Sequence, residues 1–364
     1  MQKTVTTRQL IFILVISVLT LKVLFLPNVL ATNIGRDGYI FLFFMLFMDF
    51  LVLLMLLYLM NKYKDKTFYE MLESMVGKIG AKIIMFLLFL YFLTRCWTRF
   101  QTSFIYLNEN LYTSFDWYIF AFPILIVVVF CVMQGIKAFA RLSEFFVPVI
   151  IFGFLVAFVV GVVRADFTNA LPFLENGLNF ILSSHKYSLW FGDYLILILF
   201  FGRVKMDKKF NLKVILSMLI LILVIATFYA VFYFTYNYNT VCHINAISDI
   251  MQFLPSVSDI GSFDWILILI WDIALFLDLT LNTFAAVFAF SQVFTKKGSA
   301  IVATVILLVI LLINYLLNFN VFMSMLIFRD YLWYYNVLVQ GGVPLLIFII
   351  GLCKRRKKDE VPVA

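Results

Sequence analysis

Seven charged side chains lie inside stretches that otherwise consist of apolar, membrane-type residues. A charge that faces lipid in mid-bilayer costs roughly 2.5 to 3.5 kcal/mol on insertion scales, so opposite charges are expected to turn inward and to meet each other or a ligand. Three of the seven are cations and four are carboxylates. They are Lys22, Asp49, Arg95, Arg99, Asp193, Asp272 and Asp278.

The two arginines belong to a polar stripe with helical spacing. Arg95, Thr98, Arg99, Thr102 and Tyr106 repeat at intervals of three and four residues, which places them on one helix face. Two guanidiniums one turn apart repel each other unless an anion lies between them, and arginine grips a carboxylate with two parallel bonds. The stripe therefore indicates either contact with a ligand carboxylate or a structural ion pair with a neighbouring helix.

A later apolar stretch supplies the acidic counterpart. Asp278 and Asn282 are spaced i,i+4 and share a face, whereas Asp272 lies roughly 120° away around the helix at about 100° per residue. The two aspartates are therefore not expected to point into the same small cavity. We expect one of them to meet a neighbouring helix or a partner subunit.

Two stretches carry signals of a helix break in mid-membrane. In the first, Thr20 and Lys22 precede Pro27, which removes a backbone donor. In the second, Phe191, Gly192 and Asp193 stand where a plain helix would keep apolar residues. Half-helix ends expose dipoles that can hold the charged groups of a ligand.

Asp49 and Asp272 have no assigned ligand role. Lys22 is the cation nearest to Asp49 along the chain and lies at comparable membrane depth. We expect Asp49 and Asp272 to take part in ion coupling or in structural pairs.

The composition predicts an all-α membrane protein. Of the 364 residues 64% are hydrophobic, 19% are aromatic and only 13% are charged, too few for a soluble globular surface. A membrane-spanning helix needs about 20 mainly apolar residues. Ten such stretches are predicted, at Gln9–Ala31, Gly38–Met60, Ile79–Leu107, Trp117–Met133, Phe145–Val163, Leu178–Phe201, Leu212–Phe234, Phe263–Phe294, Ala300–Leu317 and Trp333–Leu352.

Lysine and arginine residues predict the orientation. They concentrate in alternate loops and in the tail at 354–364, and short cytoplasmic loops carry an excess of positive charge. Both termini are therefore expected in the cytoplasm. Residues 1–353 are expected to form one polytopic domain, followed by the basic cytoplasmic tail.

Several function classes are not expected. The chain lacks nucleotide-binding glycine motifs and a nucleophile elbow, so no enzyme activity is predicted. The two histidines and four cysteines lack metal-ligand spacing, so neither a metal nor another cofactor is expected. The net charge of +8 reflects topology, and nucleic acid is not expected as a partner.

The order of several short sequences across the chain resembles a known family. They are TTRQLIFILVISVLTLKVLFLPNVLA with GRDGYI, QGIKAFARLSEFFVP, DFTNALPFLENG, WFGDY and FDWILILIW. This pattern resembles the B-subunit permeases of spore germinant receptors, in the amino acid/polyamine/organocation superfamily. The resemblance implies a five-plus-five inverted repeat, about 9–163 and 178–317 with a further helix at 333–352, broken first and sixth helices, and a site walled by the third and eighth.

Two positions depart from the family pattern. Lys22 stands where members carry small, glycine-containing sequence, and Asp193 replaces a glutamate, which preserves the charge. The lysine could replace a bound cation, bind a ligand carboxylate or block the cavity.

The leading hypothesis is a receptor subunit of the inner spore membrane. It would bind an amino acid or similar small polar germinant in the lipid bilayer and assemble with soluble-domain and lipoprotein subunits. The candidate ligand residues are Thr20, Lys22, Arg95, Arg99, Phe191, Gly192, Asp193, Asp278 and Asn282. A proton- or cation-coupled amino acid transporter and a scaffold with purely structural ion pairs are the alternatives.

Overall fold

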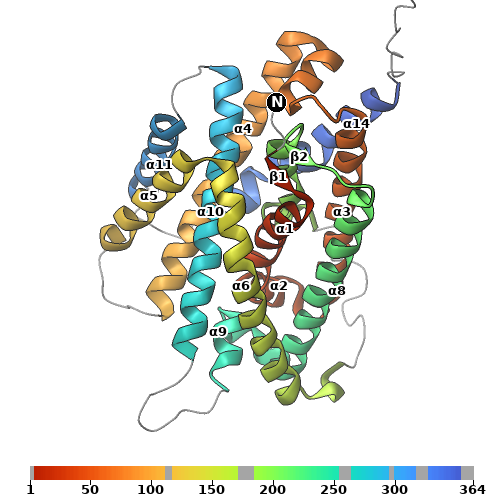
Figure 1. The fold of residues 1–364 in the computed structure, drawn as a ribbon. Coiled ribbons are helices and arrows are strands. Elements are labelled where there is room, and N and C mark those ends of the chain that lie inside the picture. Colours follow the sequence, from red (N-terminus) through yellow and green to blue (C-terminus); the bar gives the residue numbers. More distant parts are fainter. Residues whose placement is uncertain are drawn as a thin grey trace, which may run out of the picture.

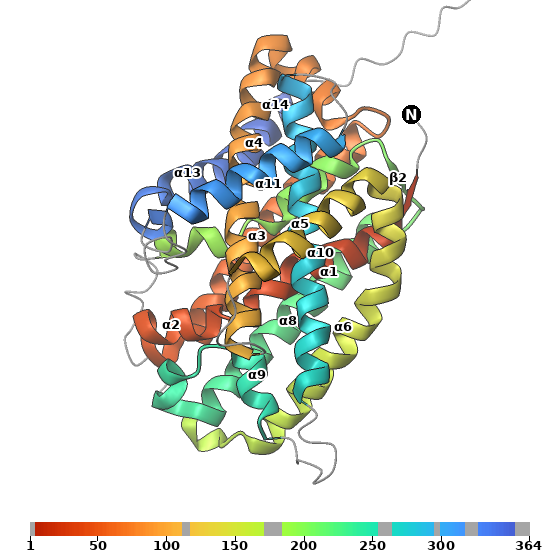
Figure 2. The ribbon, with the colours of Figure 1, turned by 90° about the vertical axis from the view of Figure 1, so that its left-hand side faces the viewer.

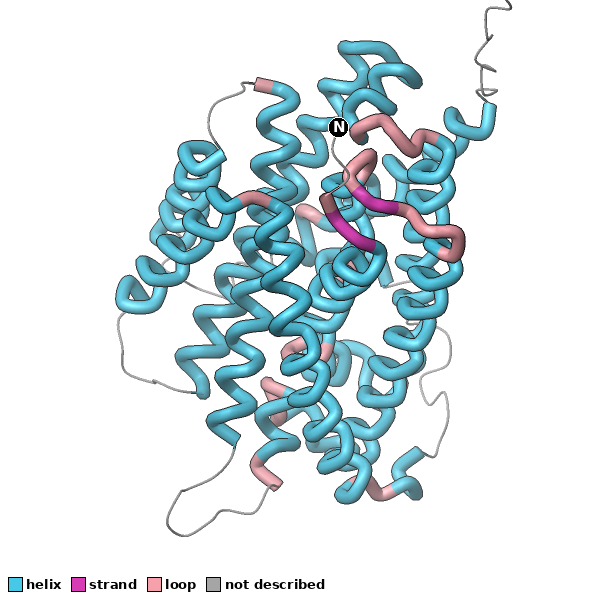
Figure 3. Tube along the Cα trace, viewed as in Figure 1, coloured by secondary structure: helices cyan, strands magenta, loops and turns pink. Residues whose placement is uncertain are grey.

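The computed structural model describes residues 4–110, 117–170, 184–253, 264–294, 299–316 and 327–353. These residues are almost entirely helical, as Figure 3 shows. The start of the sixth predicted span and the basic tail at 354–364 lie outside the described residues.

The helices of the first half are α1 (Thr7–Lys22), α2 (Leu26–Ile34), η1 (Gly35–Asp37), α3 (Gly38–Lys62), α4 (Phe68–Asn110), α5 (Trp117–Gln134), α6 (Ile136–Arg164) and η2 (Phe167–Ala170). Those of the second half are η3 (Ser184–Trp190), η4 (Asp193–Phe200), α8 (Phe210–Tyr236), η5 (Asn237–Cys242), α9 (Ala246–Met251), α10 (Asp264–Val293), α11 (Ser299–Leu316), η6 (Ile327–Tyr331), α13 (Trp333–Val337), η7 (Leu338–Gly342) and α14 (Val343–Cys353).

Within the described residues, six helices are long and apolar enough to cross a membrane, and a seventh span is obtained if α1 and α2 count as one. The apolar parts of α5 and α11, Ala121–Gln134 and Ile301–Leu316, are shorter. This establishes an all-α, multi-pass membrane protein. The ten-span inverted repeat stays a prediction.

Long helices pack side by side around α1, which runs through the middle of the molecule (Figure 1). In Figure 1, α3 and α8 lie to its right, and α4, α6 and α10 to its left. The helices α5 and α11 cross α4 and α10 obliquely on the outside of the bundle (Figure 2). The short segment η4 contacts α1, α3, α4 and α10, so it occupies the centre of the packing.

Helix α4 begins at Phe68, but a kink at Gly77, where φ is +78°, divides it, so the predicted third span starts just after the kink. The predicted start of the fifth span was wrong. The fifth begins at Ile136, because the stretch expected as a cytoplasmic connection continues the helix. The last span runs from Trp333 to Cys353, close to its predicted bounds, and its middle part, η7, is π-helical.

A two-stranded parallel sheet, which the sequence did not predict, joins the chain start to the end of η4. Strand β1 (Val5–Thr6) pairs with β2 (Val204–Lys205). The backbone N–H of Thr4 also donates to Arg203 O at 2.9 Å. This sheet fixes the beginning of α1 against the segment that follows η4.

The chain is bent by 45° between α1 and α2, in the region of the expected interruption of the first span. The break frees backbone carbonyls, and α8 and the start of α9 supply their partners. The Tyr229 hydroxyl donates to Lys22 O, and the Tyr233 hydroxyl donates to Pro27 O at 3.0 Å. The N–H of Ala246 donates to Leu24 O at 3.0 Å. These bonds satisfy buried carbonyls that no water could reach in a membrane interior.

We expect Tyr229→Phe to lower the free energy of unfolding by about 1–3 kcal/mol, because it leaves the buried Lys22 carbonyl without its donor. Tyr58→Phe is the matched control, since Tyr58 is 40% exposed. Thermal unfolding in nanodiscs measures both. Equal stability of the two variants would contradict the role assigned to α8.

Candidate functional site

Asp193 is the meeting point of three cations from two helices. Its carboxylate forms ion pairs with Lys22 of α1 and Arg95 of α4, and its Oδ1 lies 3.3 Å from Nη2 of Arg99. All four side chains are at most 1% exposed. One carboxylate therefore holds α1, α4 and η4 together in the protein interior.

The second carboxylate, Asp278 of α10, pairs with one of these arginines. Its Oδ2 accepts from Nε of Arg99 at 2.9 Å. Asn282, one turn later, donates to Asp278 Oδ1 at 3.1 Å and accepts from Arg95 Nε at 3.1 Å. The spacing predicted that Asp278 and Asn282 share a face, and in the structure this face lies against the arginine stripe of α4. Of the two alternatives for the stripe, the ion pair with a neighbouring helix is therefore present.

The ends of the interrupted segments suit the charges placed there. Lys22 is the last residue of α1, where the helix dipole favours a cation. Asp193 is the first residue of η4, where the positive end favours an anion. Lys22 Nζ also lies 5.2 Å from the ring centroid of Phe191, within range of a cation–π contact.

Gly192 provides the turn that presents Asp193. Its φ of +81° is a left-handed conformation, and a Cβ would come within 2.5 Å of the Tyr91 hydroxyl and of Gln340 Cγ. Its N–H donates to Asp49 Oδ1 at 3.0 Å, and its carbonyl accepts from the Tyr91 hydroxyl at 3.3 Å. The side chain of Asp49 is therefore bonded to the backbone at the break, and it also lies within electrostatic range of Lys22.

Arg95 is anchored on both sides of its guanidinium. Its Nη2 donates to Asp193 and its Nε to Asn282. Its Nη1 donates to the Phe191 carbonyl at 2.6 Å and to the Tyr91 hydroxyl at 2.9 Å. These contacts satisfy a carbonyl that the interruption at Gly192 leaves outside regular helical bonding.

Two buried polar atoms of this cluster have no hydrogen-bond partner among the described residues. One is a donor, Nη1 of Arg99, and the other is an acceptor, Oδ2 of Asp49. A buried polar atom without a partner is unfavourable, and more so when its group carries charge. The cluster therefore contains one donor and one acceptor that the described residues leave unpaired.

The structure brings together eight of the residues singled out in the sequence, including Asp49, and we call this group the charge cluster. The eight are Lys22, Asp49, Arg95, Arg99, Phe191, Asp193, Asp278 and Asn282, with Gly192 supplying the backbone between two of them. Thr20 is buried, but its hydroxyl donates to Ile16 O of its own helix at 2.6 Å. Asp272 lies apart from this cluster, close to Tyr106.

Sequence reasoning missed two neighbours of the break, Tyr91 and Gln340. The Gln340 side chain lies against Gly192 and donates to Ser188 O at 2.8 Å. It belongs to η7, and π-helical turns often occur at functional sites. Tyr91 lies four residues before Arg95, so the arginine stripe could have been extended by one turn.

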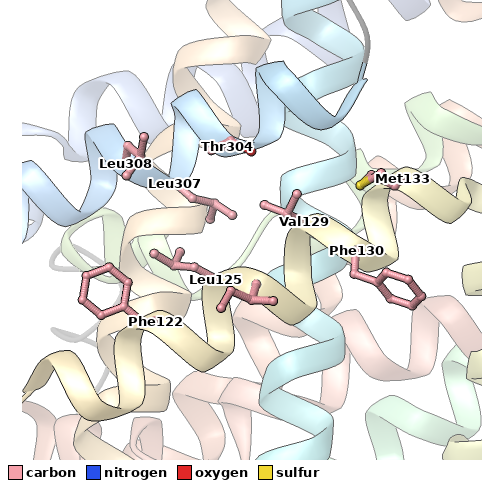
Figure 4. A pocket seen from close by; sticks show the side chains of 9 residues that line it. Phe122, Leu125, Val129, Phe130, Met133, Thr304, Leu307 and Leu308 are labelled. Atoms are coloured by element: carbon pink, nitrogen blue, oxygen red, sulfur yellow. The ribbon is translucent and has the colours of Figure 1, made fainter.

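An apolar groove is found between α5 and α11, away from the charges. Its volume is about 440 Å³, and Figure 4 shows that residues such as Leu125, Val129 and Leu307 line it, with Thr304 as the one hydroxyl-bearing side chain among the lining residues. Such a lining offers nothing to hold the charged groups of a polar ligand. The candidate site is therefore the charge cluster.

We expect Gly192→Ala to destabilise the protein, because the backbone conformation costs roughly 1–2 kcal/mol with a side chain and the clash with Tyr91 and Gln340 adds about 1–3 kcal/mol. Gly341→Ala is the control, since a Cβ there has no neighbour within 4 Å. The thermal unfolding temperature in nanodiscs measures both. Equal unfolding temperatures would show that the turn does not require glycine.

Comparison with known families matches the chain to one of them. The spore permease family, described as spore germination protein, matches residues 4–322. No curated protein matches the chain. The family contains receptors and permeases rather than enzymes. Because the match covers most of a chain that the fold identifies as a multi-pass membrane protein, the chain belongs to the spore germination protein family and thus to the permeases related to germinant receptors.

Proposed function

We propose that the chain is the membrane subunit of a spore germinant receptor and that its charge cluster binds an amino acid or a similar small polar germinant. The observation that carries the proposal is the pair of unsatisfied buried atoms, the donor Arg99 Nη1 and the acceptor Asp49 Oδ2. An α-amino acid presents a carboxylate to the first and an ammonium group to the second.

The cluster is also placed where a ligand could change the conformation. Lys22 and Asp193 connect α1 to η4, the two segments that end or begin at an interruption. A ligand carboxylate would compete with Asp193 and Asp278 for the three cations, and a ligand ammonium would compete with the cations for the carboxylates. A germinant signals through its difference in affinity for the two resulting conformations.

The broken first and sixth spans support the ten-helix, inverted-repeat arrangement that the family resemblance implies. The bend between α1 and α2 and the turn at Gly192 are five spans apart in the predicted order. In this arrangement the termini lie in the cytoplasm, the membrane is the inner spore membrane, and soluble-domain and lipoprotein subunits complete the receptor.

Lys22 acts in this proposal as a fixed cation. Its ammonium group lies between the ends of α1 and η4, and three carbonyls around the first break, of Lys22, Leu24 and Pro27, are already bonded to protein donors. A metal cation at the same place would have to displace these bonds. We therefore expect germinant binding not to require sodium.

We expect Arg99→Gln and Asp49→Asn each to weaken germinant binding by about ten- to one hundred-fold, since a hydrogen bond to a charged group contributes about 1.5–3 kcal/mol. Ligand-dependent thermal stabilisation of the purified receptor, with a panel of L-amino acids, measures the affinity. Germination of spores that carry each variant measures the response.

Lys213→Gln is the control for these variants, because Lys213 pairs with Asp207 at an exposed site outside the cluster. It should respond to germinant as the unmodified chain does. An unchanged response of Arg99→Gln and Asp49→Asn in an assembled receptor would remove the proposed site.

The second candidate function is a proton-coupled amino acid transporter, which the buried Asp49 carboxylate favours. It is 5% exposed, and one of its oxygens is unpaired, so it could carry a proton between two conformations. Uptake of labelled amino acids into proteoliposomes under a pH gradient separates the functions. Transport that Asp49→Asn abolishes would favour the transporter, and binding without uptake would favour the receptor.

A further inference from the structure

The proposed function makes no use of the apolar groove between α5 and α11. Leu125 and Leu307 are its buried lining residues. Ile126, Phe130 and Met133 line it from α5 and are each more than half exposed. The groove therefore presents hydrocarbon side chains on the outside of the bundle, where a membrane protein meets lipid (Figures 2 and 4).

The two helices that form the groove are short. At about 1.5 Å per residue, their apolar parts, Ala121–Gln134 and Ile301–Leu316, extend for about 21 and 24 Å, against about 30 Å for the hydrocarbon layer of a membrane. Both also cross α4 and α10 obliquely (Figure 2). A membrane-spanning helix of a partner would therefore project beyond the groove. A lipid acyl chain would not, because it covers only one leaflet, about 15 Å.

The end of α5 leads into a basic part of the chain, on the side of the bundle that carries β1 and β2 (Figure 1). Met133, which lines the groove, precedes Lys137 by four residues, and four residues reach at most about 14 Å. Lys137 and Arg141 lie one turn apart on α6, and both are exposed. The Met133 end of the groove is therefore followed by two cationic side chains.

The acidic side chain in this region does not neutralise these cations. Glu144 lies within electrostatic range of Arg141, but its two carboxylate oxygens are bonded to other partners. Arg8 Nη2 donates to Oε1 at 2.6 Å, and Gln9 Nε2 donates to Oε2 at 2.9 Å. Arg8, Lys137 and Arg141 thus carry more positive charge than one carboxylate compensates, and the region attracts anions.

An apolar groove that ends at exposed cations is complementary to an anionic phospholipid. The groove offers apolar contacts to an acyl chain, and the basic side chains offer charge-assisted hydrogen bonds to a phosphate. Basic sites beside membrane helices on the cytoplasmic side bind anionic head groups. The lysine and arginine pattern predicts that this side of the protein is cytoplasmic. A zwitterionic head group gains less, because its own cation is repelled by the same side chains.

We propose that the groove between α5 and α11 binds one acyl chain of an anionic phospholipid, whose head group lies against Lys137 and Arg141. The site is separate from the charge cluster and does not depend on ligand binding there.

Photo-cross-linking with lipids of defined head group tests this proposal. The full-length protein is placed in phosphatidylcholine nanodiscs with a small fraction of phosphatidylglycerol or phosphatidylcholine that carries a diazirine in one acyl chain, and mass spectrometry identifies the labelled residues. We expect the phosphatidylglycerol probe to label groove residues such as Ile126 and Leu308 about ten-fold more, because each basic side chain near a membrane surface strengthens the binding of anionic lipid several-fold. Unlabelled phosphatidylglycerol should compete, and added phosphatidylcholine should not.

Two variants separate the contributions of charge and groove. Lys137→Gln with Arg141→Gln should reduce phosphatidylglycerol labelling to the phosphatidylcholine level, and both side chains are exposed, so the fold should persist. Lys208→Gln with Lys209→Gln is the matched control, because it removes the same charge from another exposed stretch, and it should keep the preference. Leu308→Trp narrows the groove and should lower labelling although both cations remain.

Two results would overturn the proposal. One is equal labelling of the groove by both probes, which would mean that bulk lipid covers it without selection. The other is absence of label in the groove while the exposed Ile220 of α8 is labelled, which would mean that a second copy or a partner helix covers the groove.

Discussion

The interior of this protein is organised by the need to neutralise charge where no water can do so. Lys22, Arg95 and Arg99 are at most 1% exposed, and Asp193 contacts all three. Removing one member of a buried ion pair typically costs 3–5 kcal/mol, because the partner is left uncompensated. Because the three cations share one carboxylate, each of the four side chains depends on the others for its neutralisation. The positions of α1, α4 and η4 are therefore coupled.

The breaks between α1 and α2 and before η4 make this sharing possible. In a continuous helix, the backbone polar groups around Lys22 and Asp193 would already be bonded to each other. At a helix end they are not, and the dipole there favours the cation at the end of α1 and the anion at the start of η4. The interruptions also create unsatisfied carbonyls, which Tyr229, Tyr233 and Arg95 occupy. In the proposed function, stability and ligand recognition therefore draw on the same contacts, and a germinant that rearranged the ion pairs would also change the packing of the helices.

The charged part of the site could be predicted from the sequence because charge in an apolar helix is a strong signal. The spacing of Arg95 and Arg99 predicted their common face, and the ion pair between Arg99 and Asp278 is one of the two alternatives that the spacing left open. The bond between Asp49 and the Gly192 N–H could not be predicted, because any backbone N–H freed by a break could donate to this carboxylate. The contacts of Tyr229 depend on the crossing of α8 over the break and leave no periodic pattern. The helical stretch before Gly77 in α4 and the first turns of α6 were missed because hydropathy marks the apolar part of a helix, not its ends.

The coupling between Lys22 and Asp193 tests this account most directly. Unfolding free energies of Lys22→Met, Asp193→Asn and the double variant, measured in nanodiscs, give the interaction energy of the pair. The account predicts strong coupling, with the double variant more stable than Asp193→Asn alone, because removing one cation relieves the repulsion that loss of the shared carboxylate creates. Additive effects of the two substitutions would show that the side chains do not meet and would contradict the central role of Asp193.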